Sequence, residues 1–105
     1  MVHPDIQSQL PLLIQLLEKH KIKRAFLFGS SVTEHFKKDS DIDLLISFDN
    51  VTDPLEKGEL ILNLQIALED CMHRPVDLLT ETSLKNPFFI EEISEKKIKI
   101  YDQGN

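Results

Sequence analysis

The stretch LFGSSVTEHFKKDSDIDLLI, from Leu27 to Ile46, decides how this chain folds. It ends in an apolar run that predicts a buried strand, and two carboxylates enter that strand one residue apart. Asp41 and Asp43 are expected on one face of the strand, about 7 Å apart at the backbone, because side chains alternate between the two faces. Carboxylates held that close need a cation between them or a proton on one of them. The pair therefore predicts a site for a hard cation such as Mg²⁺, which prefers carboxylates, water and phosphate oxygens.

A third acid, Asp77, stands in PVDLLT (75–80), which predicts another buried strand. An isolated carboxylate in such a segment is costly unless it has a partner or an ion. If the two strands are neighbours, Asp77 completes a three-carboxylate metal site with Asp41 and Asp43. An ion pair of Asp77 with Arg74 or a lysine explains the sequence equally well.

Gly29 and Ser30 follow the strand that ends at Phe28, and a short helix is expected to begin there. Glycine at such a bend lets the backbone approach a ligand closely. The free N–H groups of a helix start suit phosphate, and the Ser30 hydroxyl can add a hydrogen bond. A glycine and a serine after a strand are usually just a turn. Their joint occurrence with the acids, in this order, predicts a phosphate cradle facing a cation site, which suits a nucleoside triphosphate with magnesium.

Periodicity predicts alternating helices and strands along the whole chain. The expected helices are residues 4–20, 54–71 (capped by Asp53) and 87–96 (capped by Asn86). The expected strands are residues 24–28, 41–48 and 75–80, with residues 97–102 as a closing strand or an extended tail. One sheet with helices packed against it would bury every apolar stripe, so we expect a single α/β or α+β domain over residues 1–105. The pattern leaves the strand order open.

Composition limits the function classes. The chain has 105 residues and a formal net charge of −6, which argues against a domain that grips a nucleic-acid backbone on its own. Basic runs such as EKKIK (95–99) stand beside expected helix ends, where positive charge complements the helix dipole. Cys71 is the only cysteine, which excludes an internal disulfide and fits a reducing, cytoplasmic setting. No apolar run is long enough to span a bilayer.

The order FGS, ten residues, then DID, with a further Asp on a later strand, resembles the signature of the DNA polymerase beta-like nucleotidyltransferase superfamily. The short chain is similar to the minimal nucleotidyltransferase branch of that superfamily. This branch often forms the antitoxin half of a two-gene pair whose toxin is a HEPN-domain ribonuclease. The resemblance covers most of the chain, from the strand at Leu27 through Asp77 to the final KIKIYD.

The resemblance implies a small mixed sheet flanked by helices and a role for each candidate residue. Gly29 and Ser30 would bind the triphosphate of ATP. Asp41 and Asp43 would ligate magnesium, and Asp77 would be the third carboxylate, helping to activate the attacking hydroxyl. In the antitoxin branch, AMP is moved onto a tyrosine of the partner toxin, which silences it. The resemblance thus implies a protein adenylyltransferase with a HEPN toxin from the adjacent gene as partner, and leaves homo- and hetero-oligomers open.

One departure from the family lies just after the first strand. Many members read roughly Gly-Ser-x-Ala-Arg-Gly there, whereas this chain reads GSSVTE, with Thr33 in the place of the arginine and Glu34 in the place of the glycine. An arginine there could help to neutralise phosphate charge, and a nearby glutamate would repel it. Lys37 or Lys38 could compensate, although solvated surface roles suit both better. The departure keeps a second function open: a weakly active or inactive binding module that neutralises its partner by contact alone.

Overall fold

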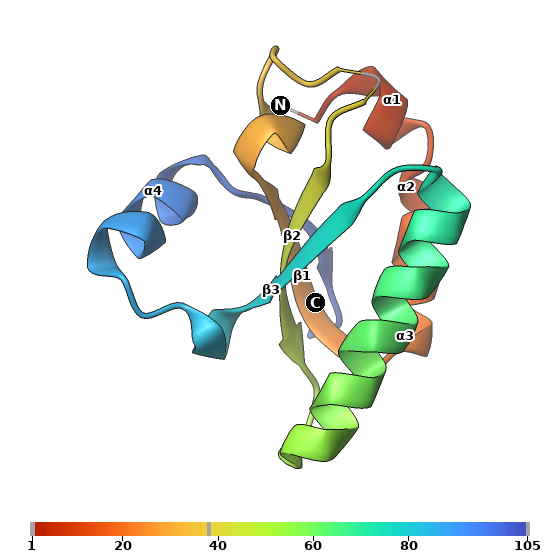
Figure 1. The fold of residues 1–105 in the computed structure, drawn as a ribbon, viewed down its shortest axis with the longest axis vertical. Helices are drawn as coiled ribbons and strands as arrows, with labels where there is room; N and C mark the ends of the chain where they lie inside the picture. Colours follow the sequence, from red (N-terminus) through yellow and green to blue (C-terminus); the bar gives the residue numbers. More distant parts are fainter. Residues whose placement is uncertain (1, 38, 105) are drawn as a thin grey trace.

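The structure, a computed structural model, describes residues 2–37 and 39–104 and is built around a four-stranded sheet in the order β3-β2-β1-β4 (Figure 1). The elements in chain order are α1 (Pro4–Gln7), α2 (Leu10–Lys19), β1 (Ile22–Phe28), the 3₁₀ helix η1 (Gly29–Val32), β2 (Ile42–Phe48), α3 (Pro54–Met72), β3 (Val76–Thr80), the 3₁₀ helix η2 (Glu81–Ser83), α4 (Pro87–Lys96) and β4 (Ile98–Asp102). In the described part of the chain, no helix combines the length and the apolar character that crossing a membrane requires. The predicted fold class, a small mixed sheet flanked by helices, is confirmed.

The sheet is mixed because its two central strands pair differently with their outer neighbours. β1 pairs antiparallel with β2 on one side and with β4 on the other. β2 pairs parallel with β3, and a parallel pair needs a crossover connection, which α3 provides. The closing segment is therefore an edge strand rather than an extended tail.

The alternation of side chains in β2 separates two packed layers. Ile42, Leu44 and Ile46 are buried in the main core, as the period of two predicted. On this face, α2 and α3 contribute Leu13, Leu17, Leu64 and Leu68. Leu45 points to the opposite face and packs with Ile93 of α4 in a smaller cluster. Figure 1 shows α2 and α3 together on one side of the sheet and α4 on the other.

The prediction of one continuous N-terminal helix over residues 4–20 is wrong. The segment is divided into α1 and α2, with Ser8 and Gln9 in a turn between them. Pro11 explains the break, because proline has no N–H and its ring would clash with the carbonyl of Gln7 inside a continuous helix. Pro11 lies instead in the first turn of α2, where a missing N–H costs no helical hydrogen bond.

The two predicted helix caps are present. The Asp53 carboxylate accepts a hydrogen bond from the Leu55 N–H at 3.2 Å at the start of α3. The Asn86 side chain accepts hydrogen bonds from the N–H groups of Phe88 and Phe89 at 3.0 and 3.4 Å at the start of α4. Only one side chain of α4 is buried, so this helix depends on its cap more than α3 does.

Replacing Asn86 by alanine removes the cap of α4. We expect Asn86→Ala to lower the free energy of unfolding by about 1 kcal/mol, because the Phe88 and Phe89 N–H groups lose their acceptor. Urea unfolding followed by circular dichroism measures the change. The control is Asn63→Ala in the exposed middle of α3, which should be neutral or slightly stabilising because alanine is the better helix former. An equal loss of stability in both variants would contradict the capping role.

Candidate active site

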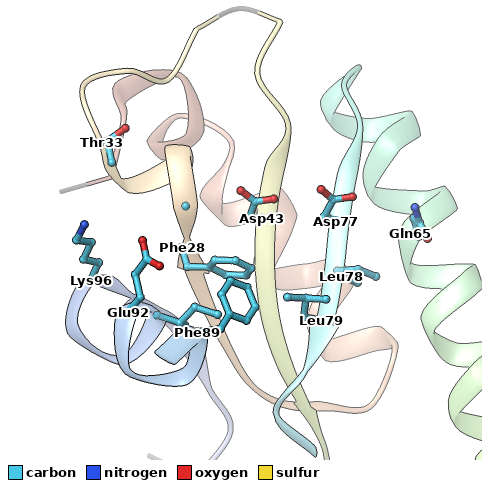
Figure 2. A pocket seen from close by; sticks show the side chains of 12 residues that line it. Phe28, Thr33, Asp43, Gln65, Asp77, Leu78, Leu79, Phe89, Glu92 and Lys96 are labelled. Atoms are coloured by element: carbon cyan, nitrogen blue, oxygen red, sulfur yellow. The ribbon is translucent and has the colours of Figure 1, made fainter. Parts of the chain in front are cut away.

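A cavity of about 620 Å³ opens on the face of the sheet that carries α4, and Figure 2 shows the side chains that line it. Its walls come from the segment between β1 and Thr33, from the neighbouring strands β2 and β3, from α4, and from Gln65 of α3. The volume lies in the range of small-molecule and cofactor sites. Of the residues singled out in the sequence, Gly29, Asp43 and Asp77 line this cavity.

Asp43 and Asp77 lie side by side because β2 and β3 run parallel with these two residues in register. Figure 2 shows the two carboxylates at the same level on adjacent strands. Asp43 is half-buried, and Asp77 is exposed. The structure therefore brings together two of the three acids expected to converge.

The local environment disfavours two negative charges on this pair. Burial first, then the neighbouring Asp77 carboxylate and, least, Asp41 raise the pKa of Asp43 from its ordinary 3.8 to about 6. A cation bound at the carboxylates would favour their charged forms and remove this conflict. Carboxylate oxygens are the ligands that hard cations such as Mg²⁺ prefer. The donor set at the cavity therefore fits a divalent cation.

Glycine is required at position 29 for two separate reasons. The φ angle of Gly29 is +63°, a left-handed conformation that side chains disfavour. A Cβ at this position would also collide with the Oδ2 atom of Asp43. The exposed backbone of Gly29 thus passes directly against the Asp43 carboxylate.

The rest of the bend differs from the sequence-based expectation. The predicted short helix is the single 3₁₀ turn η1, so a helix dipole adds little to anion binding there. Ser30 is half-buried and is not among the residues lining the cavity; its carbonyl accepts hydrogen bonds from the N–H and the hydroxyl of Thr33, both at 3.1 Å. Ser31, which the sequence did not single out, is completely buried, and its hydroxyl accepts the Asp43 N–H at 3.1 Å. The only sequence feature that could have indicated Ser31 is that it is a small polar residue directly after Gly29 and Ser30.

Asp41 is placed differently from the other two acids. It is exposed and precedes β2, so the strand begins at Ile42 and not at residue 41. Over residues 2–37 and 39–104, no three His, Cys, Asp or Glu side chains are arranged closely enough to hold a metal ion. Asp41 therefore stands outside the Asp43–Asp77 pair, although its charge still acts on Asp43.

The alternative partner for Asp77, an ion pair with Arg74, is not formed among the described residues. Nη1 of Arg74 instead donates to the carbonyls of Lys37 and Ser40, both at 3.1 Å. The guanidinium group also lies 4.5 Å from the centre of the Phe36 ring. Arg74 thus stabilises the loop that leads into β2 through contacts with its backbone and with Phe36.

The residues at and after the position where many family members have an arginine differ in whether they reach the cavity. Thr33 lines the cavity, whereas Glu34 is exposed and is not part of its lining. Lys37 is exposed, and its backbone N–H donates to the Ser40 hydroxyl at 2.8 Å. Lys38 lies outside the described residues. The structure therefore gives no support for Lys37 as a replacement for the arginine.

α4 brings four residues to the cavity that the sequence did not assign to a site. Phe89, Glu92, Ile93 and Lys96 line it, and their spacing of three, four and seven residues from Phe89 places them on one side of the helix. Nothing in the sequence shows which face of the sheet α4 covers, so the spacing alone could not identify these residues.

Comparison with known proteins connects this geometry to a family. The family described as "Polymerase beta, Nucleotidyltransferase" matches residues 12–105. A protein of Methanocaldococcus jannaschii, provisionally named a protein adenylyltransferase, is 39% identical over 85 residues, which cover 81% of this chain and 83% of the relative. The protein adenylyltransferase MntA of Thermococcus cleftensis is 32% identical over 72 residues, which cover 69% of each chain.

Solved structures share the fold. A structure provisionally described as a minimal nucleotidyltransferase has a TM-score of 0.71 at 26% identity and covers 93% of this chain and 95% of its own. A toxin-antitoxin complex with AMP-PNP has a TM-score of 0.69 at 21% identity, covering 90% of this chain and 73% of its own. A complex of the tri-AMPylated Shewanella oneidensis HEPN toxin with an MNT antitoxin has a TM-score of 0.60 at 22% identity, covering 93% and 73%. The last two likenesses concern the fold alone. From the family match, the relatives and the fold together, the chain belongs to the polymerase beta-like nucleotidyltransferases and is an enzyme of their minimal nucleotidyltransferase branch.

Proposed function

We propose that the chain is the antitoxin of a toxin-antitoxin pair and that it moves AMP from ATP onto a tyrosine hydroxyl of a HEPN-domain toxin encoded by the adjacent gene. Relatives named protein adenylyltransferase support the reaction type, one of them provisionally named so. The fold is shared with toxin-antitoxin complexes, one with AMP-PNP and one with an AMPylated HEPN toxin. These similarities support ATP as the donor and a HEPN protein as the acceptor.

The observation that carries the proposal is the close approach of Gly29 to Asp43, whose register partner on β3 is Asp77, with all three residues lining one cavity. Asp43 and Asp77 would hold magnesium, which when bound neutralises the phosphate charge in the transition state, and Asp41 would become the third ligand only by turning toward this pair. Gly29 would hold the phosphates of the nucleotide through its backbone, and the hydroxyl of Ser30, which lies outside the cavity lining, would have to turn toward them to add a hydrogen bond. A raised pKa of Asp43 is what an acid pair built for a cation is expected to have without the ion.

The proposed reaction transfers one nucleotidyl group. The acceptor oxygen bonds to the α-phosphorus as the bond from that phosphorus to the bridging oxygen breaks, and pyrophosphate leaves. Asp77 is the exposed member of the acid pair, and in the proposed reaction it accepts the proton of the incoming hydroxyl. Asp43 has its backbone N–H fixed by Ser31, which suits a residue that positions a metal.

The first turn of α4 suits a protein as the acceptor. Phe88 is 82% exposed, and its neighbour Phe89, which is 40% exposed, lines the cavity. Ile90 is also exposed, at 37%. Large apolar side chains gathered beside a cavity are typical of a protein-binding surface. A toxin that covers this turn would have its acceptor hydroxyl close to the acids.

A second function, neutralisation by contact without turnover, is favoured by the position of Asp41 outside the acid pair and by Thr33 at the place of the arginine. The two functions differ in a growth assay with the toxin. A folded chain carrying Asp43→Asn and Asp77→Asn that still protects the cells would favour contact alone. Loss of protection with the complex still formed would favour transfer.

Incubation with α-labelled ATP, Mg²⁺ and the product of the adjacent gene tests the transfer. We expect label on the toxin, and a rate at least about 100-fold lower for Asp43→Asn and for Asp77→Asn, because each removes several kcal/mol of charge stabilisation. Asp70→Asn, on the exposed face of α3, is the control and should transfer label at the native rate. Transfer that persists in both site variants would rule out the proposed site.

Replacing Asp43 by asparagine should stabilise the metal-free protein at neutral and higher pH. The folded pKa of about 6 exceeds the ordinary 3.8, so ionising Asp43 destabilises the fold above about pH 6, and the penalty fades as the pH falls towards 3.8. Solvent screening of this half-exposed group limits the gain to about 1 kcal/mol. Thermal unfolding in EDTA should therefore show a higher Tm for Asp43→Asn at about pH 8 and little difference at about pH 4.

With magnesium present, we expect the native chain to have a higher Tm than Asp43→Asn, the reverse of the order in EDTA. Millimolar Mg²⁺ should raise the Tm of the native chain, because the ion binds only the folded state, and should have little effect on Asp43→Asn. Asp70→Asn serves again as the control and should respond like the native chain. A native Tm that does not change with Mg²⁺, with Asp43→Asn less stable than the native chain at about pH 8, would show that the acids are not built around a cation.

A further inference from the structure

Lys96 is the one lysine or arginine that lines the cavity, counted over residues 2–37 and 39–104. It is the last residue of α4, and Glu92 precedes it by one turn of the helix. In Figure 2 the Lys96 ammonium and the Glu92 carboxylate lie on the side of the cavity where Thr33 is found, across Phe28 from Asp43 and Asp77. The cavity thus has an acidic end on the sheet and a second charged end on α4.

Among the described residues that line the cavity, only Lys96 has a lysine or arginine side chain that can attract an anion. Asp43, Asp77 and Glu92 are acidic, and a nucleoside triphosphate adds about four negative charges, of which magnesium neutralises part at the sheet. The phosphate groups furthest from the sheet acids need another positive group. Lys96 can supply it, because among the described residues its ammonium forms no ion pair. A lysine ammonium is a compact point charge with three donors, which suits phosphate oxygens.

We propose that Lys96 binds the phosphate groups of the nucleoside triphosphate, in the region of the cavity where the arginine of other family members is replaced by Thr33. This inference rests on the proposed function, because it names a further binding residue for the same nucleotide. α4 is then part of the nucleotide site as well as a partner surface.

Lys96 could also act by stabilising the end of α4, and another lysine of the chain provides a control for this alternative. Positive charge at a helix C-terminus stabilises the helix wherever it occurs. Lys19 is the last residue of α2 and is exposed, as Lys96 is in α4, but it does not line the cavity. The next residue, Lys97, has its ammonium 4.2 Å from the centre of the Phe26 ring and is held there by that contact. Lys19 therefore separates the helix-end role from nucleotide binding.

Calorimetric titration of the full chain with ATP in Mg²⁺, and with adenosine, tests the proposal. We expect Lys96→Gln to raise the Kd for ATP about tenfold, the low end for a hydrogen bond to a charged group, and to leave the Kd for adenosine unchanged. Lys19→Gln should bind ATP like the native chain, and Lys96→Arg should retain most of the affinity. Glu92→Gln removes a repelling charge and should lower the Kd for ATP by about threefold.

The outcomes separate this inference from the proposed function. Lys96→Gln that binds ATP as tightly as the native chain overturns the role of Lys96 and leaves the proposed function intact. Equal weakening of ATP and adenosine, or equal weakening by Lys19→Gln, also overturns it, because the lysine would then act through the fold. A native chain that binds no ATP in Mg²⁺ overturns both. Thermal unfolding checks that the variants are folded.

Discussion

The parallel register of β2 against β3 is the constraint on which the candidate site depends. It places the carboxylates of Asp43 and Asp77 next to each other, where two negative charges repel. The strands stay together because their other faces are buried: Ile42 and Val76, also register partners, are 0% and 1% exposed in the main core. Apolar burial on one face of the sheet thus offsets an electrostatic conflict on the other, and the proposed cation would relieve that conflict.

The bend after β1 depends on the same acid. Ser31 accepts the backbone N–H of Asp43, and Gly29 passes so close to the Asp43 carboxylate that no side chain fits between them. The segment proposed to hold phosphate and the segment proposed to hold metal are therefore fixed to each other at one residue. Groups that must act together on a developing charge need this kind of mutual fixation, because movement between them would cost transition-state stabilisation.

Local signals predicted the elements, and contacts between distant segments decided the site. The alternation of Ile42, Leu44 and Ile46 and the capped proline starts of α3 and α4 are local, and they are present as expected. The break at Pro11 was also local and could have been predicted from the missing N–H. The contact of Asp43 with Asp77 depends on strand order, which periodicity does not determine. The position of α4 depends on which face of the sheet the chain crosses after β3, and this decides which of its residues reach the cavity.

The two layers of the molecule differ in how firmly they hold their parts of the site. The acids and the bend rest on a large core shared by α2, α3 and the sheet. α4 rests on the smaller cluster of Phe28, Leu45 and Ile93. Local opening free energies follow the amount of apolar surface buried, so α4 can shift at a lower cost than the acids can separate. The groups proposed to react thus lie in the firmly held layer, and α4, proposed to contact the partner, lies in the weakly held layer. This division would suit the proposed transfer to a folded protein, because the wall proposed to meet the partner can adjust while the reacting groups stay in place.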